Sequence, residues 1–522
     1  MFGPTETGET LMHRPNSRTL ATLLLCGVSV TAAFAPTPAS AVPAIGVSPA
    51  SDHPGVKVTI TGSKFGASEA IDIYFDSTDE ILAVTDSKGA FAKHSFTVPV
   101  DALPGEHWIT AVGRRDGDGA QKLFTVATTW GEHGFKPNGK RNNPWENVVS
   151  SKNVKKLDIA WVASTGSHIV SSPAAVNGTI YVGSGDNKLY AFSAVTGATL
   201  WSASTGNSID SSPAVANGIV YVGSDDGKLY AFNASTGALL WTASTGNAIQ
   251  SSPAVANGAV IVGSADGTLY AFNASSGAPL WSTATSGLIY SSPAIADGFV
   301  YVGSSDGHLW GFHADTGVAR LRLSLSGVYS SPAVANDIVY VGSFDNNLYA
   351  VEPFFGRVLW AAATSGPIFS SPAVANGVVY LNSDDTLYAF DAETGASAWS
   401  APIHQNSQSS PQSAHQRTTS PPFTLAYSAP AVANGVVYVG STDTNIYAFD
   451  ALTGAALWSA TTGDAIVSSP TVADGFVYVG SNDGRLYAFA IDGGDNVSYK
   501  RQHTQPPSFA TLHPDYRLKQ TL

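Results

Sequence analysis

A repeat of forty residues is the feature that most constrains this chain, because a period of that length indicates a row of equivalent structural units. A Ser-Ser-Pro or Ser-Ala-Pro mark recurs with its proline at Pro173, Pro213, Pro253, Pro293, Pro332, Pro372, Pro430 and Pro470. Each mark is followed by an apolar strand such as 220–224, a turn that contains aspartate, and a second strand such as 229–232. A Thr-Gly turn and a tryptophan close the unit. Short strands separated by such turns predict an all-β chain.

The phase of the repeat predicts how the row of units closes. The tryptophan position is filled by Trp161, Trp201, Trp241, Trp281, Leu321, Trp360, Trp399 and Trp458. The first of these precedes the first mark, and no tryptophan strand follows the last mark. We therefore expect the strand around Trp161 to complete the final unit, which removes the two free sheet edges of an open array. This arrangement predicts eight four-stranded blades.

The closing segment of the unit resembles the tryptophan-docking motif of PQQ-like propellers. It reads Ala231-x-Asn233-x-x-Thr236-Gly237-x-x-x-Trp241 and recurs at 271–281, 389–399 and 448–458. The resemblance covers residues 161–490 and implies an eight-bladed PQQ-like β-propeller in which each tryptophan covers the neighbouring blade. The family contains quinoprotein dehydrogenases, which hold pyrroloquinoline quinone and Ca²⁺ over the channel mouth. It also contains non-enzymatic scaffolds.

The residues on either side of the propeller predict further parts. Residues 42–128 show short strands such as 56–61 and 70–75 between turn residues, which favours an immunoglobulin-like β-sandwich. The stretch 47–66 resembles the opening of IPT/TIG-type domains, which implies a spacer or adhesive module. Residues 129–160 form a linker that we expect to pack as a strap, because Trp130 and Trp145 are costly to leave in water. Residues 491–522 form a polar C-terminal tail.

The first 41 residues have the three parts of an export signal. Arg14 and Arg18 precede an apolar stretch at 20–35, and Ala39-Ser40-Ala41 supplies a small-x-small cleavage pattern. The single cysteine, Cys26, lies inside this segment, so the mature chain has no thiol and no disulfide. We expect a secreted, extracellular or periplasmic, protein after cleavage of this signal peptide.

Composition excludes some partners. Charged residues make up 12% of the chain, and the formal net charge is −13. A nucleic-acid partner requires a basic stripe, so nucleic acid is not expected. No later apolar run approaches the length of about 20 residues that a spanning helix needs, so no transmembrane segment is expected. We expect a monomer whose partner is an envelope or extracellular protein, a peptide or a glycan.

Most recurrent polar residues have a structural explanation. An aspartate occupies the same turn position in all eight units, where it can accept hydrogen bonds from the backbone of its own turn. These residues are Asp186, Asp226, Asp266, Asp306, Asp345, Asp385, Asp443 and Asp483. A catalytic carboxylate does not require eight copies. The same reasoning applies to the serine pairs and the Thr-Gly turns.

A functional site must therefore come from positions where the repeats differ. The residue before each mark is expected near the mouth of the central channel, on the top face where the innermost strands begin. Around the ring these residues are Val170, Asp210, Gln250, Tyr290, Tyr329, Phe369, Tyr427 and Val467. Aromatic side chains that face polar ones are typical of a small-molecule, glycan or peptide site. The alternative is that the rings merely fill the channel end.

Two departures lie on the same face. Phe344 replaces a small or polar turn residue, and an insertion at 400–427 lengthens one connection. The candidate ligand-binding residues are Asp210, Gln250, Tyr290, Tyr329, Phe344, Phe369 and Tyr427. His404 and His415 lie on the insertion without a nearby carboxylate, so no metal site is expected there. The insertion is expected to be either a lid over the mouth or a disordered loop.

These features favour a secreted, non-enzymatic binding scaffold that uses the top face and needs no cofactor. The alternative is a PQQ-dependent dehydrogenase, with pyrroloquinoline quinone and calcium, or a carbohydrate-active enzyme. The quinoprotein site implied by the resemblance uses a vicinal disulfide that a chain without mature cysteines cannot form. No Ser/His/Asp set, zinc motif or phosphate loop stands out to indicate another chemistry, and no catalytic residue is assigned.

Overall fold

The computed structural model describes residues 42–403, 428–494 and 506–512. Tyr427, the expected signal peptide and nearly all of the insertion at 400–427 lie outside these residues. Within them the chain is almost entirely β-structure. Its helical elements are the short η1 (Val154–Lys156), η2 (Asp492–Gly494) and α1 (Phe509–Leu512).

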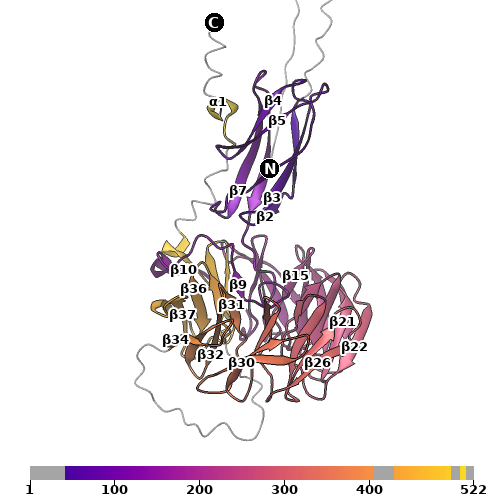
Figure 1. The fold of residues 1–522 in the computed structure, drawn as a ribbon, viewed down its shortest axis with the longest axis vertical. Helices are drawn as coiled ribbons and strands as arrows, with labels where there is room; N and C mark the ends of the chain where they lie inside the picture. The colour runs from indigo at the N-terminus through magenta and orange to yellow at the C-terminus, as the bar shows by residue number, and fades with distance from the viewer. Residues whose placement is uncertain (1–41, 404–427, 495–505, 513–522) are drawn as a thin grey trace, which may run out of the picture. The chain divides into compact units, whose positions relative to one another are not determined.

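Residues 44–126 form a sandwich of two sheets, drawn in indigo to magenta in Figure 1. One sheet has the order β1-β3-β6 and the other β2-β8-β7-β4-β5. The strands are β1 (Ala44–Ser48), β2 (Ser51–Asp52), β3 (Lys57–Ser63), β4 (Ala70–Phe75), β5 (Thr78–Val84), β6 (Phe91–Thr97), β7 (Gly105–Gly113) and β8 (Gly119–Val126). Both sheets contribute to one core, for example through Ile60, Ile73 and Phe124. Its assignment to the IPT/TIG-type family stays a prediction.

The forty-residue repeats form eight antiparallel sheets, which are the blades of a propeller. Blades 1 to 4 are β11 (Ala174–Val176) to β14 (Thr199–Ser204), β15 (Ala214–Ala216) to β18 (Leu239–Ser244), β19 (Ala254–Ala256) to β22 (Pro279–Ala284), and β23 (Ala294–Ala296) to β26 (Ala319–Ser324). Blades 5 to 7 are β27 (Ala333–Ala335) to β30 (Arg357–Ala363), β31 (Ala373–Ala375) to β34 (Ser397–Pro402), and β35 (Ala431–Ala433) to β38 (Ala456–Thr461). In each blade the first strand is the innermost and the last is the outermost.

The two middle strands of each blade carry most of the propeller core. In blades 1 to 4 these strands are β12 (Thr179–Ser184), β13 (Lys188–Ser193), β16 (Ile219–Ser224), β17 (Lys228–Asn233), β20 (Ala259–Gly263), β21 (Thr268–Asn273), β24 (Phe299–Ser304) and β25 (His308–His313). In blades 5 to 7 they are β28 (Ile338–Gly342), β29 (Asn347–Glu352), β32 (Val378–Ser383), β33 (Thr386–Asp391), β36 (Val436–Gly440) and β37 (Asn445–Asp450). Side chains on both faces of the second strands are buried, because each blade is covered by a neighbour on either side.

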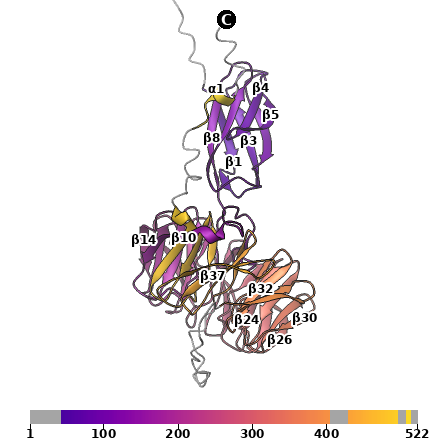
Figure 2. The same ribbon diagram turned by 90° about the vertical axis from the view of Figure 1, so that its left-hand side faces the viewer.

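Blade 8 combines strands from both ends of the repeat region. Its sheet has the order β10-β41-β40-β39, with β10 (Leu157–Ser164), β41 (Arg485–Ile491), β40 (Phe476–Gly480) and β39 (Thr471–Ala473). Trp161 of β10 lies opposite Ala488 of β41. The strand β10 therefore lies among the yellow C-terminal strands in both views (Figures 1 and 2). The predicted eight-bladed propeller, closed by the strand around Trp161, is confirmed.

The tryptophans connect neighbouring blades through one recurring hydrogen bond. The indole Nε1 of each donates to a backbone carbonyl oxygen of the next blade at 2.8–3.2 Å. The pairs are Trp161–Ala194, Trp201–Ala234, Trp241–Ala274, Trp281–Ala314, Trp360–Ala392, Trp399–Ala451 and Trp458–Leu157. Gly237 of the Thr-Gly turn has φ +71°, and a Cβ there would lie 2.7 Å from the Trp201 ring. Glycine is required for both the backbone conformation and the indole contact.

The first serine of each mark ties the innermost strand to its own blade. In every blade its Oγ accepts a hydrogen bond, 2.8–3.2 Å long, from the backbone N–H twelve residues later. The serines are Ser171, Ser211, Ser251, Ser291, Ser330, Ser370, Ser428 and Ser468. The hydroxyl supplies an acceptor to a buried N–H that the short innermost strand leaves without one.

The second serine of each mark ties one blade to the next. The backbone N–H of this residue donates to the Oγ of its counterpart one blade on, and seven such bonds of 2.9–3.3 Å run around the ring. They join Ser172–Ser212, Ser212–Ser252, Ser252–Ser292, Ser292–Ser331, Ser331–Ser371, Ala429–Ser469 and Ser469–Ser172. The Ser371-to-429 step has no such bond, because position 429 is alanine and carries no hydroxyl.

We expect Ala429→Ser to stabilise the propeller by about 1 kcal/mol, since it adds the eighth hydrogen bond at a site that holds serine in the other blades. Urea denaturation followed by tryptophan fluorescence measures the change. The matched variant Ser212→Ala removes one existing bond and should destabilise the protein by a similar amount. If Ala429→Ser destabilises the chain, the buried position 429 does not accept a hydroxyl. The ring of serine hydrogen bonds then cannot be completed at this step.

The repeated aspartates are structural in seven blades. Their carboxylates accept a hydrogen bond from a turn N–H two residues on and from the aromatic side chain four residues on, as Asp226 does from Lys228 and Tyr230. Blade 6 differs from the prediction, because Asp385 does not take the common position. Its turn is one residue shorter, with Ser383 paired directly to Thr386 and positive φ at both central residues. Asp384 instead faces Gly366.

Candidate functional site

One end of the central channel is closed by the strap. We call residues 130–143 the plug, because they follow the innermost strands in order from blade 1 to blade 8. Backbone carbonyls of the plug accept hydrogen bonds from Ala175, Val215, Ile295, Val334, Val374 and Val432. Blade 3 bonds through the Glu132 carboxyl to the Val255 N–H, and blade 8 through the Asn143 side chain to the Val472 carbonyl. The plug thus contacts the inner strand of all eight blades.

The plug continues as a short strand in blade 7. Its last residues form β9 (Asn142–Asn143), which pairs in parallel with β35. Trp130 begins the plug and is fully buried, and it exchanges two backbone hydrogen bonds of 2.7 Å with Ala175. The hydrogen bonds of the plug satisfy backbone N–H groups that the inner strands direct into the channel. The plug is therefore an integral part of the propeller fold.

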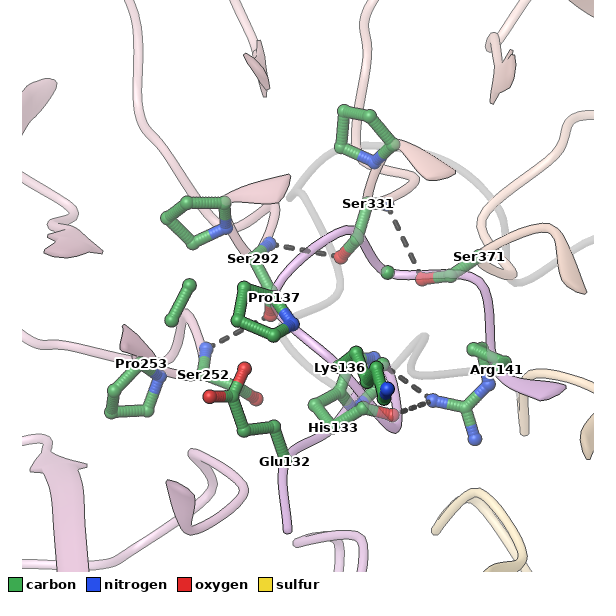
Figure 3. Close-up of a pocket in the computed structure, with 15 residues that line it drawn as sticks. Glu132, His133, Lys136, Pro137, Arg141, Ser252, Pro253, Ser292, Ser331 and Ser371 are labelled. Carbon is green, nitrogen blue, oxygen red and sulfur yellow. Dashed lines mark hydrogen bonds between the residues drawn. The ribbon is translucent and has the colours of Figure 1, made fainter. Parts of the chain in front are cut away.

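The interior of the plug is polar and nearly full. Figure 3 shows Glu132, His133 and Arg141 beside a row of serines that belong to the second position of the marks. They surround a cavity of about 20 Å³, which is room for about one water molecule. The cavity is too small for a substrate.

Arg141 is the most deeply buried charged side chain of the plug. It is 1% exposed, and its hydrogen-bond acceptors are the carbonyl oxygens of Pro430, Pro470 and His133. These carbonyls belong to blade 7, blade 8 and the plug itself. Burial lowers the pKa of Arg141 to about 9, so its guanidinium is charged at neutral pH and is stabilised by backbone dipoles.

Two other titratable groups of the plug are neutral at pH 7. Burial raises the pKa of the Glu132 carboxyl to about 8, only partly opposed by the hydrogen bond from Val255. Loss of solvation, together with the nearby Arg141 charge, holds the pKa of His133 well below its usual value. The plug therefore buries one net positive charge at neutral pH.

The opposite end of the channel carries the predicted candidate residues. The Ser-Ser-Pro marks separate the plug from the residues that precede each mark. Tyr290, Tyr329 and Phe369 are half-buried, and Phe344 is 47% exposed. We call this end the mouth.

Four aromatic side chains meet at the mouth, and we call them the aromatic crescent: Tyr290, Tyr329, Phe344 and Phe369. The rings of Tyr290 and Tyr329 stack with centroids 6.3 Å apart and an interplanar angle of 20°. The ring centroids of Tyr329 and Phe369 are 5.9 Å apart. Those of Phe369 and Phe344 are 5.7 Å apart, and these two rings meet edge to face. Three successive blades contribute to one continuous aromatic surface. Tyr427 lies outside the described residues.

The polar side of the mouth is larger than the sequence indicated. Asp210 and Gln250 are half-buried there. The side chain of Gln250 hydrogen-bonds Asp225, and the His168 Nε2 lies 3.8 Å from the Asp210 Oδ1. Burial, and next the charge of Asp210, raise the pKa of Asp225 to about 6. Sequence reasoning did not identify Asp225 and His168.

A signal for Asp225 was present in the repeat. It occupies the turn position directly before the repeated aspartate, where Phe344 stands in blade 5. Five other blades carry small or neutral residues there, namely Gly185, Ala265, Ser305, Thr442 and Asn482, and blade 6 carries Asp384. Comparing this position around the whole ring, as was done for the marks, singles out Asp225, Phe344 and Asp384.

The donor set implied by a quinoprotein site does not match the mouth. Among the residues that the structure describes, no three His, Cys, Asp or Glu side chains are grouped so that they could hold a metal ion. The only cysteine of the sequence is Cys26, so no vicinal disulfide can cover a quinone. The described residues therefore do not fit pyrroloquinoline quinone with Ca²⁺. In the same ranges no helix has both the length and the apolar character needed to cross a bilayer.

Comparison with known proteins identifies the repeats. A family model described as outer membrane protein assembly factor BamB matches residues 145–248, 225–322, 319–423 and 412–511. A search of curated proteins finds no match.

Solved structures share the fold at low identity. BamB from Moraxella catarrhalis is 18% identical with a TM-score of 0.53, over 64% of this chain and 99% of that one. Quinohemoprotein alcohol dehydrogenase from Comamonas testosteroni is 18% identical with a TM-score of 0.59, over 70% and 81%. The computationally designed Ika8 protein is 20% identical with a TM-score of 0.54, over 63% and 99%. These likenesses show the propeller fold alone, since one fold hosts unrelated functions.

Proposed function

The chain belongs to the repeat family described as outer membrane protein assembly factor BamB, and from this premise we propose that it is a secreted, non-enzymatic binding scaffold whose ligand site is the channel mouth. The expected export signal at residues 1–41 supports a location outside the cytoplasm, extracellular or periplasmic. The partner is an envelope or extracellular protein, a peptide or a glycan.

The observation that carries the proposal is the difference between the two channel ends. The plug occupies the inner strands of all eight blades at one end. The other end carries the aromatic crescent and the polar side chains Asp210, Asp225 and Gln250, with Tyr290 within electrostatic reach of Asp225. Aromatic rings together with a few polar groups are the usual lining of ligand sites.

The alternative is a quinoprotein-type dehydrogenase or a carbohydrate-active enzyme with its site at the same mouth. The fold is shared by such an enzyme, the quinohemoprotein alcohol dehydrogenase from Comamonas testosteroni. The absence of a cysteine pair from the sequence and the mismatch of the metal donors at the described mouth favour the scaffold. The regular blades favour it as well, because the repeated aspartates of seven blades and the serines of the marks have structural partners.

Peptide and glycan arrays test the proposal. The purified chain is expected to bind a defined subset of probes, and the double variant Tyr329→Ala/Phe369→Ala is expected to lose that binding. The control is Phe354→Ala/Phe355→Ala, which removes two rings that are 77% and 82% exposed on an outer turn of blade 5. Thermal melts establish that both variants are folded. Binding that survives the mouth variant, or falls equally in the control, would contradict a site at the mouth.

A further inference from the structure

We propose that the mouth selects an organic cation, an ammonium group on an aliphatic stem, held between two carboxylates and the faces of two tyrosines. The inference rests on the proposed function and specifies the ligand class of that site. The ammonium has two possible sources, a lysine side chain of a protein partner and a free alkylamine.

The first support is an excess of negative charge at the mouth. Asp210 and Asp225 both belong to blade 2, where burial and then the charge of Asp210 raise the pKa of Asp225, so the two carboxylates repel one another. Within the described residues His168 lies beside this pair, with its Nε2 3.8 Å from the Asp210 Oδ1 and its side chain 43% exposed. Ser208 donates a neutral hydrogen bond of 3.1 Å to Asp210. A bound cation would relieve the repulsion between the two carboxylates.

The second support is that Asp225 is not used by its own turn, and that its contact with Gln250 leaves one carboxylate oxygen unpaired. Its Oδ1 is buried and has no hydrogen-bond partner, which is costly for a carboxylate oxygen. The next residue, Asp226, accepts the turn and tyrosine bonds that the blade needs. Because five other blades form this turn with a small or neutral residue at the same position, the turn does not require an acid here.

The third support is that the aromatic crescent begins beside the carboxylates. Burial, then Tyr329 and then the charge of Asp225 raise the pKa of Tyr290, so Asp225 and Tyr290 are within electrostatic reach of one another. Tyr290 in turn stacks with Tyr329. An ammonium near Asp225 is therefore also near the Tyr290 ring, and a cation over the face of such a ring is attracted to it. Tyr329, Phe369 and Phe344 then offer an apolar surface to the stem.

Other ligand classes fit these observations less well. For a metal ion, the described residues contain no group of three His, Cys, Asp or Glu side chains arranged to hold it. A neutral glycan can stack on the crescent but leaves Asp210 and Asp225 without a counter-charge. An anionic ligand would add to the repulsion. An organic cation is the ligand class that can contact both the carboxylates and the aromatic crescent favourably.

Calorimetric titration of the purified chain at pH 7.5 tests the inference with two matched pairs of probes. The first pair is acetyl-Gly-Lys-Gly-amide and the same peptide with norleucine in place of lysine. The second pair is butylammonium chloride and butanol. In at least one pair the cation is expected to bind at least tenfold more tightly than its neutral counterpart. Binding by butylammonium alone identifies a free amine as sufficient, whereas binding by the lysine peptide alone identifies a protein partner.

Isosteric variants locate the site. Asp225→Asn and Asp210→Asn should each weaken cation binding at least tenfold without loss of fold, and Tyr329→Leu should weaken it as well. The control Asp297→Asn removes an exposed charge from the turn between β23 and β24, where six other blades carry asparagine, and should have no effect. Equal binding of charged and neutral probes, no binding of either cation, or an equal effect of Asp297→Asn would overturn the inference.

Failure of this inference can be separated from failure of the proposed function. A neutral or anionic array ligand whose binding depends on Tyr329 and Phe369 would overturn the cation and leave the binding scaffold in place. Array binding that is unchanged in Tyr329→Ala/Phe369→Ala, together with titrations that show no heat of binding, would overturn both the cation and the binding site at the mouth.

Discussion

Replacing Arg141 by alanine is expected to destabilise the propeller by about 3–5 kcal/mol, because it leaves buried carbonyl oxygens without their donor and opens a cavity in the plug. The side chain is 1% exposed and bonds carbonyls of blade 7, blade 8 and the plug. These contacts join the last two blades to the segment that crosses the inner strands of all eight. Urea denaturation followed by tryptophan fluorescence measures the loss.

The matched control is Lys140→Ala on the preceding residue. Lys140 is only half-buried, and its contact to blade 6 is through its backbone carbonyl, which the substitution keeps. This variant should change the unfolding free energy by less than about 0.5 kcal/mol. If Arg141→Ala is no more destabilising than Lys140→Ala, the plug is not an integral part of the propeller.

Replacing Glu132 by glutamine is expected to stabilise the protein at high pH, by up to about 5 kcal/mol. The pKa of the buried carboxyl is raised from its ordinary value of 4.5 to about 8, so the folded state resists ionisation that the unfolded state accepts. Each unit of pKa difference corresponds to about 1.4 kcal/mol. The wild-type protein should therefore lose stability as pH rises from about 4.5 to about 8 and lose no more from this group above that value. Glutamine keeps an acceptor for Val255 and does not ionise.

Denaturation at pH 4 and at pH 8.5 checks this prediction. The two proteins should differ little at pH 4, and Glu132→Gln should be the more stable at pH 8.5. The control Glu393→Gln removes an exposed carboxyl on a turn of blade 6 and should show no such pH-dependent difference. A constant offset between Glu132→Gln and the wild type at both pH values would mean that the carboxyl is not the group that titrates.

Much of the propeller could be predicted because its repeats encode local rules. The position of Trp161 before the first mark predicted the closing strand. The Thr-Gly turns predicted the positions where only glycine allows the indole contact. The plug could not be foreseen in detail. Its hydrogen bonds join a non-repetitive segment to residues up to about 330 positions away, such as Pro470. No local sequence pattern predicts contacts over such a separation.

The candidate site was only partly predictable for a related reason. Differences at one repeat position singled out Tyr290, Tyr329 and Phe369, which the structure brings together. Asp225 belongs to a different position of the repeat, and only the ring geometry brings it beside Gln250. That these residues bind a ligand stays a prediction, which the array and titration experiments test.

Calorimetric titration with pyrroloquinoline quinone, with and without Ca²⁺, tests most directly the claim that this propeller is a binding scaffold and not a quinoprotein. The account predicts no saturable heat at high cofactor concentration in either condition. Tight, Ca²⁺-dependent binding that is lost in Tyr329→Ala or Asp210→Ala would contradict it and would make the mouth a cofactor site without a disulfide.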